Sequence, residues 1–303
     1  MSKQERLLML SDLMLLAVAA VWGTSYGVVK SALAFYPVLG LLALRFGITF
    51  VILAPALRHL RTASARTLRG VLTAGALLLG IFLAETFGIQ MTRAANAAFL
   101  ISLCVVLTPL VEWLLLRRAP SRVEWAAVML SLFGAWLLAG NGALRFNPGD
   151  ALILLAALLR ALTVCVTKRV MRDPALPPLT VTAVQSGVVS AGSAAVAWLF
   201  APQQLQALPA PNGHATFWSY VAYLVLACTL FAFFAQNFAI KRSSPTRVSL
   251  LMGSEPAFGA LFACLWLGER ISPTAWAGGG LIVAASVLAT VRWSAWRAST
   301  ARA

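Results

Sequence analysis

Charged and amide side chains stand inside long apolar runs of this sequence, at depths where a membrane-spanning chain has to bury them. They are Arg45, Glu85, Gln90, Glu112, Arg160, Gln185, Gln236, Asn237 and Glu255. Ionisable groups at membrane depth are costly, and they usually face the inside of a helix bundle, where they pair or bind a solute. The first hypothesis for these residues is therefore a binding site inside the bundle.

Glu85 is the strongest single candidate for binding. It lies beside Phe82 and Phe87, and the residue 151 positions later, Gln236, has similar aromatic neighbours. A carboxylate can hold an ammonium group or a proton, amides and hydroxyls can hold a carboxylate, and aromatic faces can hold a bulky apolar group. This mixture suits a zwitterion with an apolar side chain.

A structural role is the alternative for each charged residue. Arg160, near the middle of its apolar run, could hold a substrate carboxylate or belong to a buried ion pair. Glu85 could simply pair with Arg45 or Arg160, and Arg45 is expected to be structural. Glu112 lies near the end of its run and could pair with Arg117.

Aromatic, amide and proline residues complete the predicted site. The substrate-binding set is Glu85, Trp22, Tyr26, Phe82, Phe99, Arg160, Gln236 and Asn237. The small residues after Trp22 could equally serve close helix packing. Pro109 and Pro256 are predicted hinges, because a proline removes a helical hydrogen bond and Glu255-Pro256 should break its helix.

Composition indicates that membrane helices must position these residues. Hydrophobic residues make up 60% of the 303 positions, charged residues 11%, and the mean hydropathy is +0.85. Soluble domains carry about 25% charged residues. The net charge of +15 would suggest nucleic acid as a partner of a soluble chain. Here most of the basic residues fall in short loops between apolar runs, which disfavours nucleic acid and indicates a lipid bilayer.

Ten apolar segments lie between the charged, proline and glycine breaks, each about long enough to cross a bilayer. The predicted spans are 11–29, 37–57, 70–91, 95–116, 123–140, 150–167, 179–200, 217–239, 246–267 and 274–291. The short loops between them require neighbouring helices to be antiparallel. We therefore expect an all-α membrane protein with ten transmembrane helices.

Lysine and arginine are distributed unevenly between the two sides of this predicted bundle. The two tails and the even-numbered loops hold 18 of the 24, the odd-numbered loops hold four, and Arg45 and Arg160 lie within spans. Loops rich in these residues stay in the cytoplasm. Both termini are therefore predicted to be cytoplasmic.

The two halves of the sequence resemble each other at a shift of 151 residues. Phe87-Gly-Ile-Gln-Met-Thr then aligns with Phe238-Ala-Ile-Lys-Arg-Ser, Leu100 with Leu251 and Trp125 with Trp276. Any two strings of apolar helices align to some extent, which is the alternative explanation. Since each half has an odd number of spans, a true repeat must be inverted, with a substrate site between the halves. The predicted units are residues 1–145 and 146–303, two inverted five-helix repeats around a central cavity.

Short motifs in both halves point to a known family. They are Val21-Trp-Gly-Thr-Ser-Tyr with Lys30, Leu42-Ala-Leu-Arg45-Phe, Glu255-Pro256, Leu267-Gly-Glu-Arg270 and Gly278-Gly-Gly280. Together they resemble the EamA-type branch of the drug/metabolite transporter superfamily, and within it the YddG-type exporters of aromatic and other amino acids. The resemblance implies ten helices, two five-helix halves and a central cavity. One departure is Arg117-Arg118, where the second half has Gly268-Glu269.

The resemblance implies a secondary exporter of amino acids in a bacterial inner membrane, working by alternating access without a cofactor. Protons are a candidate coupling ion, and the oligomeric state stays open. A carrier of the same fold for a nucleoside, sugar or drug is the alternative, and a multi-pass membrane enzyme or scaffold is a third. No metal site is expected, because the four cysteines are widely spaced inside apolar runs. The sequence also has no phosphate-binding loop, HExxH or GxSxG motif, so we do not expect an enzyme.

Overall fold

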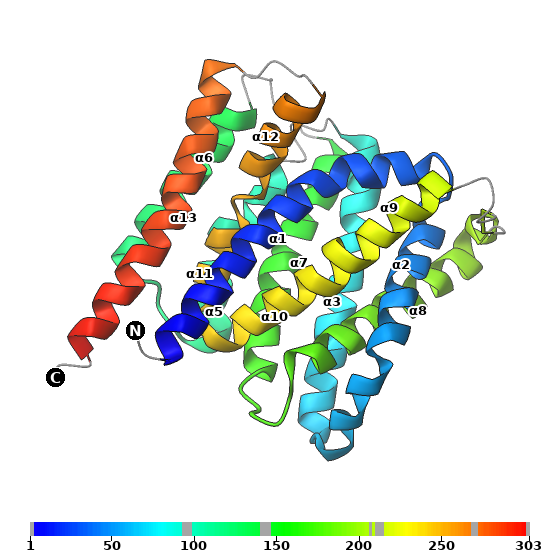
Figure 1. Ribbon diagram of the computed structural model, residues 1–303, viewed down its shortest axis with the longest axis horizontal. Helices are drawn as coiled ribbons and strands as arrows, with labels where there is room; N and C mark the ends of the chain where they lie inside the picture. Colours follow the sequence, from blue (N-terminus) through cyan, green and yellow to red (C-terminus); the bar gives the residue numbers. More distant parts are fainter. Residues whose placement is uncertain are drawn as a thin grey trace.

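The computed structural model describes residues 3–92, 99–139, 147–205, 208–209, 215–267 and 272–300. Helices account for nearly all of this part of the chain, and the described residues include no β-strand (Figure 1). The helices lie against one another in a single bundle, with both chain termini at the same end. We call this end the terminal end and the other the opposite end.

The first half contributes five long helical segments. They are α1 (Lys3–Leu33), α2 (Val38–Leu53) with the 3₁₀ helix η1 (Ala54–Thr62), α3 (Ala65–Met91), α5 (Cys104–Leu116) preceded by helical residues 99–102, and α6 (Arg122–Ala139).

The second half contains more helices because two of its segments change geometry along their length. They are α7 (Pro148–Val170), α8 (Pro178–Phe200), the 3₁₀ turn η2 (Pro202–Gln204), α9 (Ala215–Val225), the π-helix η3 (Leu226–Phe231), α10 (Ala232–Arg242), α11 (Pro245–Met252), α12 (Glu255–Leu267) and α13 (Pro273–Thr300). The α9–η3–α10 segment is one uninterrupted helical run.

Nine helices of the described residues are long and apolar enough to cross a membrane. They correspond to nine of the ten predicted spans. The remaining one, 246–267, is divided into α11 and α12, of eight and 13 residues, and neither alone reaches the length of a span. The structure is that of a multi-pass membrane protein.

Local sequence explains where several helices begin. Asn147 caps α7 by accepting a hydrogen bond from the backbone N–H of Asp150, whose carboxylate accepts one from the N–H of Asn147. Proline follows directly as the first helical residue, where its missing N–H has no cost. Ser244 and Pro245 begin α11 with the same combination of side-chain cap and proline.

Equivalent positions of the two halves depart from regular helix in the same way. The N–H of Leu103 donates to the carbonyl of Leu100, and the N–H of Ser254 donates to the carbonyl of Leu251, so each bond spans three residues instead of four. These two bonds are 151 residues apart. So are the first residues of α5 and α12, and the first residues of α6 and α13. The shift found in the sequence therefore also relates backbone features.

Two glycine pairs allow helices to cross in backbone contact. A Cβ atom on Gly23 of α1 would lie 2.7 Å from the backbone nitrogen of Gly259 in α12. A Cβ atom on Gly278 of α13 would lie 2.5 Å from the carbonyl oxygen of Gly134 in α6. Small residues at such crossings are the usual basis of helix packing in membranes. The α6–α13 pair stands at one side of the bundle in Figure 1.

The structure places the helix interruptions differently from the sequence prediction. The ninth predicted span is interrupted at Gly253 and Ser254, and Pro256 is the second residue of α12, where a proline begins a helix rather than breaks it. The fourth predicted span is interrupted at Leu103, and α5 continues through Pro109. The hinge role of these prolines remains a prediction.

Candidate functional site

A cavity of about 740 Å³ lies inside the bundle. Both halves of the chain supply its walls, from α1, α2, α3, the α5 segment and α6 in the first half, and from α7, α8 and α10–α13 in the second. A volume of this size is typical of sites for small organic molecules. Apolar side chains form most of the wall, and a few charged and amide groups project among them.

Most of the predicted site residues line this one cavity. They are Trp22, Phe82, Glu85, Phe99, Arg160, Gln236, Asn237 and Pro256. Tyr26 lies on α1, but its side chain is outside what the structure describes. Pro109 is buried in α5 and is not part of the described cavity wall. The cavity brings the candidates together, and their contact with a substrate remains a prediction.

The arginine in α7 pairs with a glutamate that the sequence suggested as part of a hinge. Arg160 Nη1 lies 3.4 Å from Glu255 Oε2, at the first residue of α12, and both side chains line the cavity. The guanidinium carbon of Arg160 also lies 5.5 Å from the centre of the Trp22 ring, a favourable cation–π position. Of the alternatives for Arg160, an ion pair is present, and it lies at the cavity surface.

An aromatic cluster adjoins this pair. The Trp22 and Phe233 rings lie 5.4 Å apart between centroids, Phe233 and Phe82 6.4 Å, and Phe82 and Phe46 4.9 Å. These tilted and edge-on arrangements are favourable for aromatic rings. The Trp22 indole N–H donates to the carbonyl of Cys228 at 3.0 Å, which fixes the ring. The cavity therefore has a rigid apolar wall beside its charges.

Arg45 is anchored by the π-helix. Its Nε–H donates to the hydroxyl of Thr229 at 2.5 Å, and an Nη2 hydrogen bond reaches the carbonyl of Cys228 at 3.1 Å. Both acceptors lie in η3, where the wider helical turn rearranges the backbone hydrogen bonds. Arg45 is buried and lines the cavity. The predicted structural role of Arg45 thus has defined partners.

Amide groups form a polar patch elsewhere on the wall. The Asn237 side-chain N–H groups donate to the hydroxyl of Thr182 at 3.0 Å and to Gln185 Oε1 at 2.9 Å. Asn237, Gln185 and the neighbouring Gln236 all line the cavity. A substrate hydroxyl or carboxylate could exchange hydrogen bonds with this patch.

The cavity extends to the opposite end of the bundle. Its wall there includes Val38 at the first residue of α2, Ala139 at the last of α6, and Ser272 just before α13. Towards the terminal end, the described wall stops at Thr167 and Ile240, before the loops that follow α7 and α10. The described wall therefore runs along most of the length of these helices.

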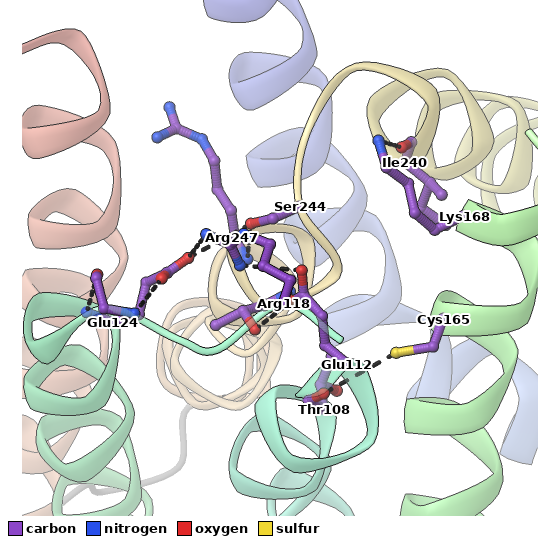
Figure 2. Close-up of polar contacts among 11 residues, drawn as sticks. Thr108, Glu112, Arg118, Glu124, Cys165, Lys168, Ile240, Ser244 and Arg247 are labelled. Carbon is purple, nitrogen blue, oxygen red and sulfur yellow. Dashed lines mark hydrogen bonds and ion pairs between the residues drawn. The ribbon is translucent and has the colours of Figure 1, made fainter. Parts of the chain in front are cut away.

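Ion pairs and hydrogen bonds join the two halves at the terminal end (Figure 2). We call this set the terminal-end network; it comprises Asp12, Glu112, Arg118, Glu124, Ser244, Thr246 and Arg247. Arg118 bridges Glu112 at 2.9 Å and Glu124 at 2.7 Å. The predicted partner of Glu112, Arg117, is therefore wrong by one residue. Arg117 directly follows α5 in a left-handed conformation (φ 55°), and the next residue, Arg118, makes the ion pair.

Contacts across the halves surround this bridge. Glu112 Oε2 accepts hydrogen bonds from the N–H of Thr246 at 2.9 Å and from its hydroxyl at 2.6 Å. Arg247 pairs with Asp12 of α1 at 2.5 Å. Burial favours the neutral form of Arg118, but hydrogen bonding to Glu124 and the charge of Glu112 outweigh it and raise the pKa of the guanidinium. Arg118 therefore keeps its charge at any physiological pH.

The model of the EamA-like transporter family matches residues 9–140 and again 147–291 of this chain. Together the two matches cover most of its length. The chain belongs to the EamA-like transporter family. The family is one of membrane transporters, so this EamA-family chain is placed among transporters rather than enzymes, with a small-molecule substrate and a lipid bilayer as its surroundings.

Curated relatives of this chain are also named as transporters. An uncharacterized transporter of Archaeoglobus fulgidus is 27% identical over 290 residues, covering 93% of this chain and 86% of the relative. The uncharacterized inner membrane transporter YedA of Escherichia coli K12 is 28% identical over 284 residues, covering 91% of this chain and 89% of the relative. A crystal structure of another protein has a TM-score of 0.75 at 22% identity, covering 93% of this chain and 96% of that one, which shows a shared fold.

Sequence reasoning recognised Glu255 as a polar residue at membrane depth but assigned it to a hinge. The signal for a site residue was the Gly253-Ser254 pair directly before it, since a helix that begins inside a span exposes its first side chains at mid-depth. The π-helix that binds Arg45 has no comparable signal in the residues 226–231.

Proposed function

We propose that this EamA-family transporter exports neutral amino acids, aromatic ones among them, from the cytoplasm. The observation that carries the proposal is the central cavity, where Arg160 and Glu255 stand beside the rings of Trp22 and Phe233. An amino acid needs a cation for its carboxylate, an anion for its ammonium and an apolar wall for its side chain. All three lie within one cavity of suitable volume.

The proposed mechanism is alternating access between two inverted five-helix repeats. The matched interruptions at Leu103 and Ser254, and the equivalent first residues of α5 and α12, support two units of related structure. For transport, the contacts of the terminal-end network have to break while the opposite end closes around the substrate.

The proposed orientation follows from the basic loops. With both termini in the cytoplasm of a bacterium, the proposed state has the terminal-end network intact on the cytoplasmic side and the opposite end of the cavity open to the outside. Release of an exported substrate requires such a state. We propose Glu85, which lines the cavity, as an ammonium or proton binder, and protons as the coupling ion.

Reconstitution in liposomes tests this function. Uptake of labelled phenylalanine, alanine, a nucleoside, a sugar and a cationic drug is measured for wild type and for Glu85→Gln, with and without an imposed pH gradient. Saturable flux of the amino acids above the other solutes is expected. A Glu85→Gln variant that keeps flux but loses its response to the pH gradient identifies Glu85 as the proton binder.

The control is Asp173→Asn, which lies in the loop after α7, away from the cavity. It is expected to transport like wild type. Flux of a nucleoside, sugar or drug without any amino acid flux would overturn the proposed substrate class.

A further inference from the structure

Arg160 and Glu255 can be reached from the cavity while they pair with each other. The Arg160 side chain is 21% exposed and that of Glu255 is 8% exposed. Both belong to the cavity wall, one from the middle of α7 and one from the first residue of α12. A solute in the cavity can therefore touch each partner directly.

The pair is also looser than the ion pairs that Arg118 and Arg247 form at the terminal end. Its N–O distance is 3.4 Å, whereas Arg118 lies 2.9 Å from Glu112 and 2.7 Å from Glu124. Charge-assisted hydrogen bonds usually have distances of about 2.7–2.9 Å. Less interaction is thus lost when the cavity pair separates than when the network breaks.

Neighbouring groups hold the two side chains beside the aromatic wall. The Trp22 ring lies 5.5 Å from the Arg160 guanidinium carbon and 5.4 Å from the Phe233 ring. A Cβ atom on Gly23 would lie 2.9 Å from the Glu255 carbonyl oxygen, so α1 crosses directly at the residue that bears the carboxylate. The charges and the apolar wall are thereby fixed relative to each other.

We propose that Arg160 and Glu255 form a charge clamp that a zwitterion opens, in which Arg160 binds the substrate carboxylate and Glu255 binds its ammonium. This inference rests on the proposed function and names the residues that select its substrate class. A zwitterion replaces each partner of the pair with a group of the same sign, so every charge stays compensated. A singly charged solute can bind only one member of the pair, and the other member then loses its contact within the pair, which is costly inside the membrane.

Glu255 fits the ammonium better than Glu85 does. Arg45, another cation of the cavity wall, is already held in place by η3 through Thr229 and Cys228. Glu255 instead faces Arg160, so the two charges of one α-amino acid can reach both partners together.

The first test uses the wild-type protein and three ligands of similar shape. Uptake of labelled phenylalanine into proteoliposomes is inhibited with unlabelled phenylalanine, with phenethylamine, which lacks the carboxylate, and with 3-phenylpropionate, which lacks the ammonium. We expect phenylalanine to inhibit at about ten- to hundredfold lower concentration than either analogue, the range for a lost charged hydrogen bond. Equal inhibition by either analogue would overturn the clamp.

The second test separates the two charges with Glu255→Gln and Arg160→Gln. Glu255→Gln is expected to weaken phenylalanine binding about ten- to hundredfold while strengthening inhibition by 3-phenylpropionate, because Arg160 loses its competing partner. Arg160→Gln is expected to do the reverse and favour phenethylamine. The stronger inhibition by one analogue that is expected in each variant is measured as displacement of bound labelled phenylalanine. A misfolded variant cannot show such a gain.

Matched controls are Arg172→Gln and Asp173→Asn, one cation and one anion in the loop after α7 and outside the cavity wall. Both are expected to keep the wild-type order of ligands. Parallel loss of all three ligands in the two clamp variants, or an unchanged order, would show that the pair is only structural. Absence of phenylalanine flux in the wild type would instead contradict the proposed function and is thereby distinguishable.

Discussion

The carboxylate of Glu112 accepts two hydrogen bonds from Thr246, a residue 134 positions away in the other half of the chain. Glu112 is fully buried, and its second oxygen pairs with Arg118. This contact ties α5 to α11, which belong to the two segments that are interrupted at equivalent positions. The elements that the proposed mechanism must separate are thus locked together at the terminal end.

Glu112→Gln is expected to open the terminal end more often. The amide removes the charge that pairs with Arg118, and its NH2 group has to face the donors of either Arg118 or Thr246. In a variant that retains Cys165 alone among its cysteines, we expect maleimide labelling of this buried thiol to become about tenfold faster, equivalent to about 1.4 kcal/mol. Asp173→Asn, at the same end but outside the network, serves as control. Equal labelling rates in the Glu112 and control variants would show that the network does not close the cavity.

Gly23→Ala is expected to destabilise the protein by about 1–3 kcal/mol, because the new methyl group meets backbone atoms of α12 that cannot move aside. Gly280→Ala is the matched control, since a Cβ atom there has no neighbour within 4 Å. Thermal unfolding in detergent measures both. A melting temperature of Gly23→Ala equal to that of the control would contradict the close crossing of α1 and α12.

Thr229→Val removes the hydroxyl that accepts a hydrogen bond from the Arg45 Nε–H group. The variant leaves this buried N–H group without that acceptor. The expected cost is about 1–3 kcal/mol of unfolding free energy. Thr73→Val removes an exposed hydroxyl that only bonds back to the carbonyl of Arg69, so it should have little effect. Equal thermal stability of the two variants would show that the π-helix does not anchor Arg45.

Reporter fusions test the predicted orientation. A fluorescent protein fused after residue 303 should fluoresce, and alkaline phosphatase fused there should be inactive, because the basic tails are expected in the cytoplasm. Alkaline phosphatase inserted within residues 140–146 should be active. The opposite pattern would mean that the cavity faces the cytoplasm in this structure.

The sequence was sufficient to predict most of the helices, but it was not sufficient to predict the contacts between them. Apolar runs predicted nine of the spans because length and hydropathy are local properties. The interruption near Glu255 was placed at Pro256 because proline either ends or begins a helix, and only the fold distinguishes the two. The partner of Arg160 depends on how α7 and α12 are rotated against each other. No local pattern specifies this rotation.

The partners of Glu112 were also missed because they depend on contacts that no local sequence pattern specifies. Two arginines follow its helix, and the left-handed backbone at Arg117 leaves Arg118 to face the carboxylate. The second partner, Thr246, comes from the other half of the chain, which only the packing of α11 against α5 reveals. The cavity residues were recognised as a group because polar groups at membrane depth have few other places to point.

The central claim is that this protein carries neutral amino acids through one alternating site. A counterflow experiment tests this claim most directly. Proteoliposomes are loaded with unlabelled phenylalanine and diluted into a trace of labelled phenylalanine. A carrier that exchanges solutes through a single cavity should accumulate the label transiently above its equilibrium level. A signal that rises monotonically to equilibrium, or no uptake with any neutral amino acid, would contradict the account.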